Sequence, residues 1–359
     1  MAINYWYIDD SPRRDGIAKN LFTKDKLEIE PRKPETWHEI TLKAKETDFD
    51  GLLLDWQLEE EVERGDYSSA PLAQQLRVLA TEHKIKAFPI ILCSAHKNFN
   101  KNFIPDLTTH DLFDMVYSKN DLKKDSTQNE FIALANGYIK LNETSKKSYT
   151  ILHISESDYF KLDIRFQAEL DSLMQSPSHE IARFLLRELI EHQGILIDED
   201  VLAARLGINK SSDDWEKLKE KLSSLKYKGV FGEAWERWWW FEIENWWRSN
   251  FTGISLRSST ADVRVENIKQ KINLQNLVPC IKTAKSKGSS FWTVCWFSKS
   301  PLDTIDGFTL LKDETIKAWQ EKRYISLDYA LEERKKVEKE ISTIEMPRFN
   351  KLKQMYDNR

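Results

Sequence analysis

The chain of 359 residues has few cysteines and no long hydrophobic run. Its three cysteines, Cys93, Cys280 and Cys295, are odd in number and far apart, which gives neither a disulfide framework nor the spacing of a zinc site. This usage is typical of a reducing compartment, so we expect the protein in the cytoplasm. No apolar stretch approaches the length of a membrane-spanning helix, and the first residues lack the charged-then-apolar pattern of a secretion signal.

Signatures of several common activities are also missing. The sequence contains no internal repeat, no glycine-rich loop that could hold a phosphate, and no Cys/His cluster at metal-binding spacing. No histidine follows His192, so a catalytic pair with Cys295 would need a histidine that folds back from earlier in the chain. The net charge of -4 gives no electrostatic reason to expect nucleic acid as a main partner.

The first 142 residues do contain an alternation of strand and helix patterns. The run at 50–56, Asp-Gly-Leu-Leu-Leu-Asp-Trp, predicts a strand that is buried on both faces and ends at Asp55. Three other predicted strands also end in polar side chains: residues 3–8 before Asp9 and Asp10, 88–93 before Ser94, and 115–118 before Lys119. In an open parallel sheet, ligands bind beyond the carboxyl ends of the strands, so we expect these side chains to form one site.

The expected site contains three carboxylates, a hydroxyl and an ammonium group. Three carboxylates this close together require a cation between them, and Mg²⁺ prefers such oxygen-rich surroundings. A lysine and a hydroxyl opposite the metal would bind the outer oxygens of a phosphoryl group on Asp55.

Residues 1 to about 142 resemble the receiver domain of two-component response regulators, because these polar side chains occur in the same order along the chain. The resemblance covers about two-fifths of the chain and rests on five residues at the ends of four hydrophobic strands: Asp9 and Asp10 together, Asp55, Ser94 and Lys119. It implies an α/β fold with a doubly wound, five-stranded parallel sheet, followed here by a mixed, mainly α-helical C-terminal effector region.

The resemblance also implies a function. Asp55 would accept a phosphoryl group from a histidine kinase or another phosphodonor, as part of a phosphorelay. Asp9, Asp10, Asp55 and the main-chain carbonyl of Gln57 would hold Mg²⁺, and Ser94 and Lys119 would bind the phosphoryl oxygens. The protein would not be a conventional enzyme, because its chemistry would be at most self-phosphorylation from a phosphodonor and self-dephosphorylation.

Three features depart from the family pattern. The loop at 57–69 is long and acidic, whereas the family usually has a short loop with an early proline. Asn120 stands where the family usually has a proline, and Val116 stands at the position of the switch aromatic. Tyr117 comes one place later and should face the other side of the sheet. The alternative function, an unphosphorylated receiver fold used as a protein-interaction module, therefore stays open.

The resemblance does not reach the rest of the chain. Residues 143–148 are polar and indicate a linker. We expect a helical or winged-helix-like domain at 149–250 and an α+β region at 251–359 that ends in a charged helix. Within these parts, residues 149–155 and 262–266 have strand-like patterns.

Residues 198–225 have a helix-turn-helix pattern whose second helix is expected from Asp213 to Leu225. The charge of that helix is close to neutral, whereas a helix that reads DNA normally carries positive charge. A DNA-binding transcriptional regulator is therefore the second alternative, and we expect nucleic acid not to be a main partner.

Six of the thirteen tryptophans fall within 235–247. At helical spacing they would cover much of a helix, which indicates either burial in a C-terminal core or a surface for a protein partner or homodimer. Stacking platforms for nucleic-acid bases are a third interpretation, for which only Arg237 and Arg248 lie nearby. The candidates for an interaction role are Trp238, Trp239, Trp246 and Trp247.

Overall fold

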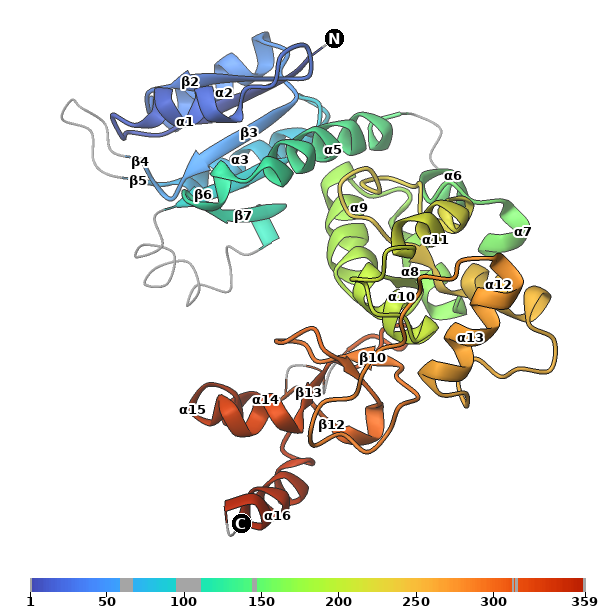
Figure 1. Ribbon diagram of the computed structural model, residues 1–359. Helices are drawn as coiled ribbons and strands as arrows, with labels where there is room; N and C mark the ends of the chain where they lie inside the picture. Colours follow the sequence, from blue (N-terminus) through green and yellow to red (C-terminus); the bar gives the residue numbers. More distant parts are fainter. Residues whose placement is uncertain are drawn as a thin grey trace. The chain divides into compact units, whose positions relative to one another are not determined.

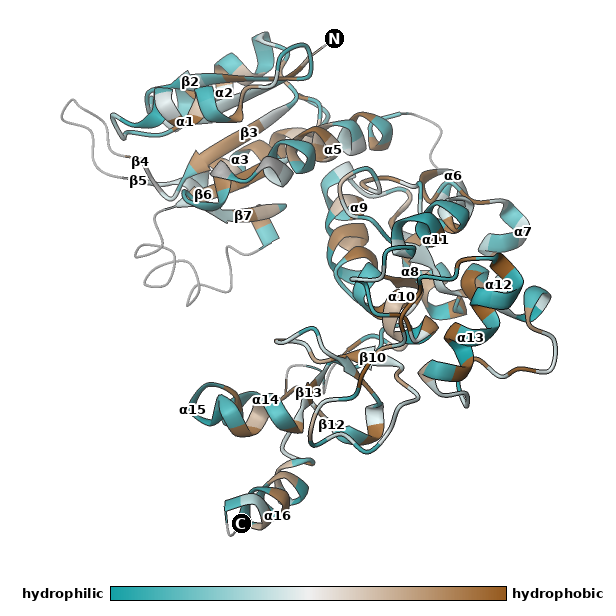
Figure 2. Cartoon of the chain, viewed as in Figure 1, coloured by the Kyte–Doolittle hydropathy of each residue, from teal (hydrophilic) through white to brown (hydrophobic). Residues whose placement is uncertain are grey.

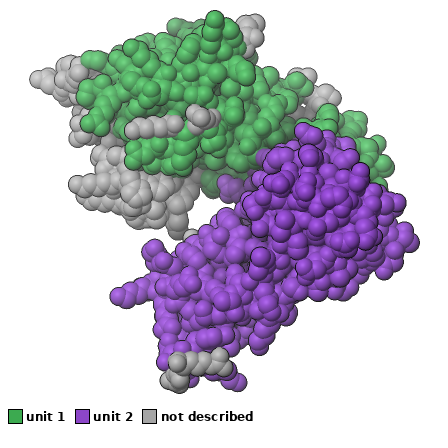
Figure 3. Space-filling view, in the orientation of Figure 1, with its two compact units in different colours: residues 1–187, 228–235 green, residues 188–227, 236–359 purple. Residues whose placement is uncertain are grey.

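The computed structural model describes residues 2–58, 67–94, 111–143, 147–311, 313 and 316–357. The chain divides into two compact units, one of residues 1–187 with 228–235 and one of residues 188–227 with 236–359 (Figure 3). The boundaries expected from the sequence, at 143–148 and at 250, differ from these units and stay predictions about which parts fold on their own.

The first unit contains a five-stranded parallel sheet. Its strands are β1 (Ile3–Ile8), β2 (Leu27–Arg32), β3 (Gly51–Asp55), β6 (Ile90–Ser94) and β7 (Met115–Ser118). They lie in the order β2-β1-β3-β6-β7, and every neighbouring pair is parallel (Figure 1). This is the doubly wound order of flavodoxin-like folds, so the predicted fold class is confirmed.

Helices follow the strands as the sequence predicts: α1 (Arg14–Leu21), α2 (Trp37–Glu46), α3 (Ser69–Thr81) and α5 (Asp125–Leu141). The fourth helix expected in this part lies outside the described residues. The central strand β3 is coloured as hydrophobic in Figure 2, in agreement with its burial on both faces. On one face of the sheet, Leu52 and Leu54 pack in a core with Leu72 and Leu76 of α3. On the other face, Tyr5 contacts Phe131 of α5 with 5.2 Å between ring centroids.

The chain forms an antiparallel hairpin directly after Asp55. Its strands are β4 (Gln57–Leu58) and β5 (Tyr67–Ser68), paired as Gln57 with Ser68 and Leu58 with Tyr67. The acidic residues expected between them, from 59 to 66, lie outside the described residues.

The first unit continues past the sheet with α6 (Ser148–Ile151), α7 (Glu156–Tyr159), α8 (Ile164–Leu173) and α9 (Ser178–Phe184), which runs on as a π-helix at Leu185–Ile190. The prediction of a strand at 149–155 is wrong. A short apolar run fits both a strand and a buried helix, and here Ile151 and Leu152 are buried in a helical turn. Ser155 then caps α7 by accepting a hydrogen bond from the Asp158 N–H.

The second unit is mainly helical with small sheets, which confirms the predicted class of this region. Its helices are α10 (Glu199–Leu206), α11 (Trp215–Lys221), α12 (Trp240–Asn250), α13 (Ala261–Ile272), α14 (Leu327–Glu332), α15 (Arg334–Val337) and α16 (Met346–Asp357). Its strand pairs are β8 (Leu196–Ile197) with β9 (Trp238–Trp239), β10 (Thr293–Val294) with β11 (Pro301–Leu302), and β12 (Gly307–Thr309) with β13 (Tyr324–Ser326).

Two local predictions in this unit are wrong. Residues 262–266 belong to α13, because their alternation is part of a longer helical pattern in which Ala261, Val265 and Ile268 are buried. The tryptophan-rich segment is helical only from Trp240, since Trp238 and Trp239 form a strand. None of the helices in the described ranges combines the length and the hydropathy of a transmembrane segment.

Candidate functional site

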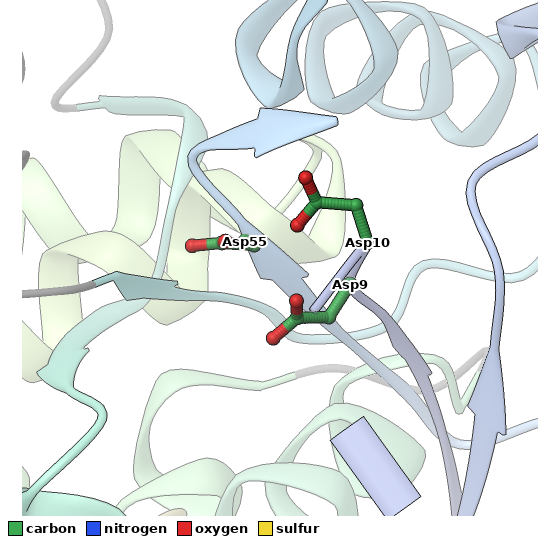
Figure 4. A group of neighbouring side chains, drawn as sticks. All are labelled: Asp9, Asp10 and Asp55. Atoms are coloured by element: carbon green, nitrogen blue, oxygen red, sulfur yellow. The ribbon is translucent and has the colours of Figure 1, made fainter. Parts of the chain in front are cut away.

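The carboxyl edge of the parallel sheet brings together the acidic residues that the sequence singles out. Asp9 and Asp10 follow β1, and Asp55 is the last residue of β3. One carboxylate oxygen from each of the three residues lies within 4.8 Å of the other two. Figure 4 shows the three side chains. Asp9 and Asp55 are buried and Asp10 is exposed, so the cluster opens to solvent on one side. An acidic group with this oxygen-rich donor set suits a hard cation such as Mg²⁺.

Lys119 joins this cluster from the end of β7. Its Nζ lies 2.7 Å from Asp9 Oδ2 and 3.0 Å from Asp55 Oδ2. Burial alone would lower the pKa of Lys119, but the charges and hydrogen bonds of Asp55 and Asp9 raise it overall. The lysine is therefore a charged ammonium group that bridges two carboxylates.

Asp9 is held by several donors. The Tyr7 hydroxyl donates to Asp9 Oδ2, and the Ser11 N–H donates to Asp9 Oδ1 at 2.6 Å. The Arg14 guanidinium donates to the Asp9 main-chain carbonyl, also at 2.6 Å. With a fully buried side chain, Asp9 is thus fixed in both backbone and carboxylate orientation.

Asp55 has a perturbed acidity. Burial raises its pKa from the ordinary 3.8 to about 6, the charge of Asp9 adds to this, and Lys119 opposes it. The Trp56 N–H donates to Asp55 Oδ1 at 2.9 Å. The pKa of Asp10 is also raised, first by desolvation and then by the charge of Asp9. A bound cation would relieve this accumulation of negative charge.

Gln57, the fourth candidate metal ligand, follows Asp55 in the hairpin. The Ser69 N–H donates to the Trp56 carbonyl at 3.0 Å. In an antiparallel ladder, this bond makes Gln57 and Ser68 a non-hydrogen-bonded pair, whose own carbonyls do not bond across the hairpin. The main-chain carbonyl of Gln57 is therefore not used by the ladder, as a metal ligand at this position requires.

Ser94 is the last residue of β6, beside the strand of Asp55. Its side chain is fully buried, and its hydroxyl has no hydrogen-bond partner among the described residues. A buried hydroxyl without a partner is costly, so a ligand oxygen at this edge would satisfy it. The neighbouring Cys93 is also buried, and burial raises the pKa of its thiol above the ordinary range, which disfavours a reactive thiolate.

The predicted orientation of Tyr117 agrees with its contacts. The Tyr117 ring packs on Phe131 of α5 with 5.7 Å between centroids, and its hydroxyl donates to Glu130. Val116 lies on the opposite face, against the core that contains Leu72. Tyr117 therefore faces the other side of the sheet from Val116, as strand alternation predicts. The backbone of the described residues contains no cis peptide bond. The peptide bond between Lys119 and Asn120 is therefore trans.

Sequence reasoning missed Tyr7 as part of the site. A signal existed, because Tyr7 lies two residues before Asp9 and strand alternation puts both side chains on one face. The hydroxyl that reaches the carboxylate could not be inferred without the structure, since most tyrosines in strands serve packing alone.

The tryptophan candidates lie elsewhere, in the second unit. Trp238, Trp239 and Trp247 are 0%, 3% and 2% exposed and belong to the hydrophobic interior, so their side chains are not available as a docking surface. The interpretation as a C-terminal core therefore fits these three residues. Trp246 is half-buried at the edge of this core, and its interaction role stays a prediction.

Two of the three lysines of the candidate DNA-reading helix, α11, form ion pairs with neighbouring acids. Lys217 forms an ion pair with Asp214 at 2.7 Å, and Lys219 forms ion pairs with Glu199 and Glu216, both at 2.8 Å. Phosphate contacts would have to compete with these pairs, and the expectation that nucleic acid is not a main partner stays a prediction.

No family model matches the sequence, and no curated protein does either. Among solved structures, the chain is similar to the RcsB response regulator of Salmonella typhimurium (14% identity, TM-score 0.27, 49% of this chain and 78% of that chain). It is similar to the chemotaxis response regulator CheY4 of Vibrio cholerae (13%, TM-score 0.25, 34% and 93%). It is also similar to a member of a redox-sensor family in the streptococci that evolved from two-component response regulators (13%, TM-score 0.30, 80% and 97%). These TM-scores are too low to support an argument about the fold. The assignment of a receiver-type fold to the first unit therefore rests on the order of its strands and on the acidic residues at the carboxyl edge of the sheet.

Proposed function

We propose that this is a response-regulator-like signalling protein, in which phosphorylation of Asp55 controls the C-terminal region. The observation that carries the proposal is the convergence of Asp9, Asp10 and Asp55 with Lys119 at the carboxyl edge of the sheet. A structural ion pair needs one acid and one base, whereas this edge gathers three acids, two of them with raised pKa values. Perturbed acids of this kind are typical of functional sites.

The donor set supports a resident Mg²⁺ ion. Asp9, Asp10, Asp55 and the main-chain carbonyl of Gln57 would hold it, because Mg²⁺ favours carboxylate and carbonyl oxygens and keeps some of its water. When bound, the ion supplies positive charge against the oxygens of an incoming phosphate.

The chemistry assigned to Asp55 is a direct phosphoryl transfer. A carboxylate oxygen of Asp55 forms a bond to phosphorus while the bond from phosphorus to the donor breaks, and the donor leaves with that electron pair. With a pKa of about 6, Asp55 is mostly ionised at neutral pH and can act as the nucleophile. Lys119 and the Ser94 hydroxyl would donate to the phosphoryl oxygens in the product.

A second candidate is the unphosphorylated interaction module. Val116 at the usual switch position and Asn120 after the lysine favour it, since both alter the part of the family that reads out phosphorylation. In that case the Lys119 bridge would be a permanent structural feature of the first unit.

One experiment separates the two. The full chain is incubated with acetyl phosphate and Mg²⁺, and its intact mass is measured. We expect one added phosphoryl group in the wild type, none without Mg²⁺, and none in Asp55→Asn. Asp48→Asn is the matched control, because Asp48 is exposed and paired with Lys86 away from the site. The interaction module would be favoured if the wild type forms no adduct and Trp56 fluorescence does not change when Mg²⁺ is added.

A further inference from the structure

Tyr7 is a buried tyrosine whose hydroxyl contacts the candidate site. It lies in β1, and its side chain is fully buried beneath the carboxyl edge of the sheet. Its hydroxyl donates to Asp9 Oδ2, the same oxygen that lies 2.7 Å from Lys119 Nζ. The Tyr7 hydroxyl and the lysine therefore share one acceptor atom.

This sharing matters because Lys119 has two carboxylate partners at once. Its ammonium group joins Asp9 Oδ2 to Asp55 Oδ2. If Asp55 becomes phosphorylated, the lysine must turn towards a phosphoryl oxygen, and its hold on Asp9 weakens. Asp9 is fully buried, and among the described donors only the Tyr7 hydroxyl would then remain on its Oδ2.

Two donors to Asp9 do not depend on the lysine. The Ser11 N–H donates a hydrogen bond to Asp9 Oδ1, and the Tyr7 hydroxyl donates one to Asp9 Oδ2. Of the two, only Tyr7 supports the oxygen that Lys119 would leave. A carboxylate that keeps a hydrogen bond on each oxygen keeps its orientation, which a metal ligand needs.

We propose that Tyr7 is a positioning residue for phosphoryl transfer, which supports Asp9 so that Lys119 can move to the phosphoryl group on Asp55. This inference rests on the proposed function. It assigns the hydroxyl a task in the transfer step, in addition to the packing that its ring provides under the sheet.

Tyr5 offers a matched control on the same strand. It is also fully buried and lies two residues earlier, so strand alternation puts it on the same face of the sheet. Its hydroxyl donates to the main-chain carbonyl of Phe131 in α5, at 2.8 Å. Tyr5→Phe and Tyr7→Phe therefore each remove one buried hydroxyl and one hydrogen bond, but only the second change touches Asp9.

The experiment compares initial phosphorylation rates of the full-length wild type, Tyr7→Phe and Tyr5→Phe over a range of acetyl phosphate concentrations in saturating Mg²⁺. Loss of one hydrogen bond to a charged group corresponds to a change of about ten- to a hundredfold in a rate. We expect Tyr7→Phe to lower the maximal rate by about this factor while the half-saturating acetyl phosphate concentration stays the same. Tyr5→Phe should leave both constants unchanged, although both variants should melt at a lower temperature than the wild type.

The outcomes distinguish this inference from the proposed function. If the wild type forms an adduct and Tyr7→Phe has the same maximal rate as Tyr5→Phe, Tyr7 is a packing residue and only this inference fails. A drop in the maximal rate for both variants in proportion to their lost stability would lead to the same conclusion. If the wild type forms no adduct, the proposed function fails and the inference about Tyr7 fails with it.

Discussion

The ring of Phe231 occupies the space in which any side chain on Gly137 would stand. A Cβ built on Gly137 would lie 2.2 Å from Phe231 Cε1. The same segment is anchored twice more in the first unit, by Asn136 Nδ2 donating to Glu233 at 3.0 Å and by the Val230 N–H donating to the Ile151 carbonyl at 2.8 Å. Residues 228–235 thus bind a distant part of the sequence to α5 and α6.

Gly137→Ala tests this close contact. Helix propensity alone would favour alanine by up to about 1 kcal/mol, but the clash with Phe231 should outweigh it and destabilise the protein by about 1–3 kcal/mol. The free energy of unfolding in urea measures the difference. Gly16→Ala is the control, because Gly16 lies in α1 with nothing within 4 Å of its Cβ position, and it should stabilise. Equal stabilisation by both changes would contradict the proposed clash.

A buried ion pair lies at the amino end of β7. Arg77 Nη2 is 2.8 Å from Asp114 Oδ2, and the two side chains are only 7% and 2% exposed. The Tyr138 hydroxyl donates to Asp114 Oδ1 at 2.6 Å, and the Ile90 N–H donates to Oδ2 at 2.7 Å. Asp114 therefore connects α3, β6 and α5 through one carboxylate.

Asp114→Ala should destabilise the protein by about 3–5 kcal/mol, because it leaves the Arg77 guanidinium buried without a charged partner. Arg77→Met in the same background should recover part of that loss, which a double-mutant cycle by urea unfolding would measure. Asp48→Ala removes the exposed pair with Lys86, in which the side chains are 75% and 81% exposed, and should cost less than about 1 kcal/mol. If Asp114→Ala costs no more than this control, the buried network contributes little.

Much of the sheet and the site could be predicted from the sequence. Residues 51–54 are a glycine and three consecutive leucines, with no polar side chain that would mark an exposed face, and this predicts a central strand. Once the strands are parallel, geometry alone gathers their terminal residues at one edge, and Asp9, Asp10, Asp55 and Lys119 lie together as expected.

What the sequence did not reveal depends on contacts over long separations or on short patterns. Nothing local to Gly137 shows that Phe231 will pack on it, because the two residues are far apart in the chain. At 262–266, a five-residue alternation suggested a strand, and only the spacing of Ala261, Val265 and Ile268 shows the helix.

The tryptophan segment provides a prediction that separates core from interface. Trp238→Ala should destabilise the second unit by about 3–5 kcal/mol, since the removed side chain is fully buried. Trp246→Ala should cost less, because Trp246 is half-buried and contacts Phe251 at the edge of the core, with 5.5 Å between centroids. Sedimentation of Trp246→Ala against the wild type tests the predicted homodimer. An unchanged sedimentation coefficient would exclude a role of Trp246 in self-association.

The raised pKa of Asp55 makes the stability of the metal-free protein depend on pH. The folded state binds the Asp55 proton more tightly than the unfolded state, with a pKa of about 6 against 3.8. Between these values the unfolded carboxyl has lost its proton and the folded one has not. The free energy of unfolding should therefore fall as the pH rises from about 4 to about 6, and stay lower above that range. The full shift corresponds to at most about 3 kcal/mol.

Asp55→Asn removes this titration and should become more stable than the wild type across the same range. At pH 4 the two proteins should be nearly equal, because a protonated Asp55 is as neutral as asparagine, and at pH 7 the variant should be ahead by up to about 3 kcal/mol. Urea unfolding in EDTA at several pH values measures the gap. Adding Mg²⁺ at pH 7 should stabilise the wild type and narrow the difference, since a ligand that binds only the folded state raises its stability. A gap that is the same at pH 4 and pH 7 would show that the Asp55 charge is not costly in the fold, and that Lys119 compensates its burial completely.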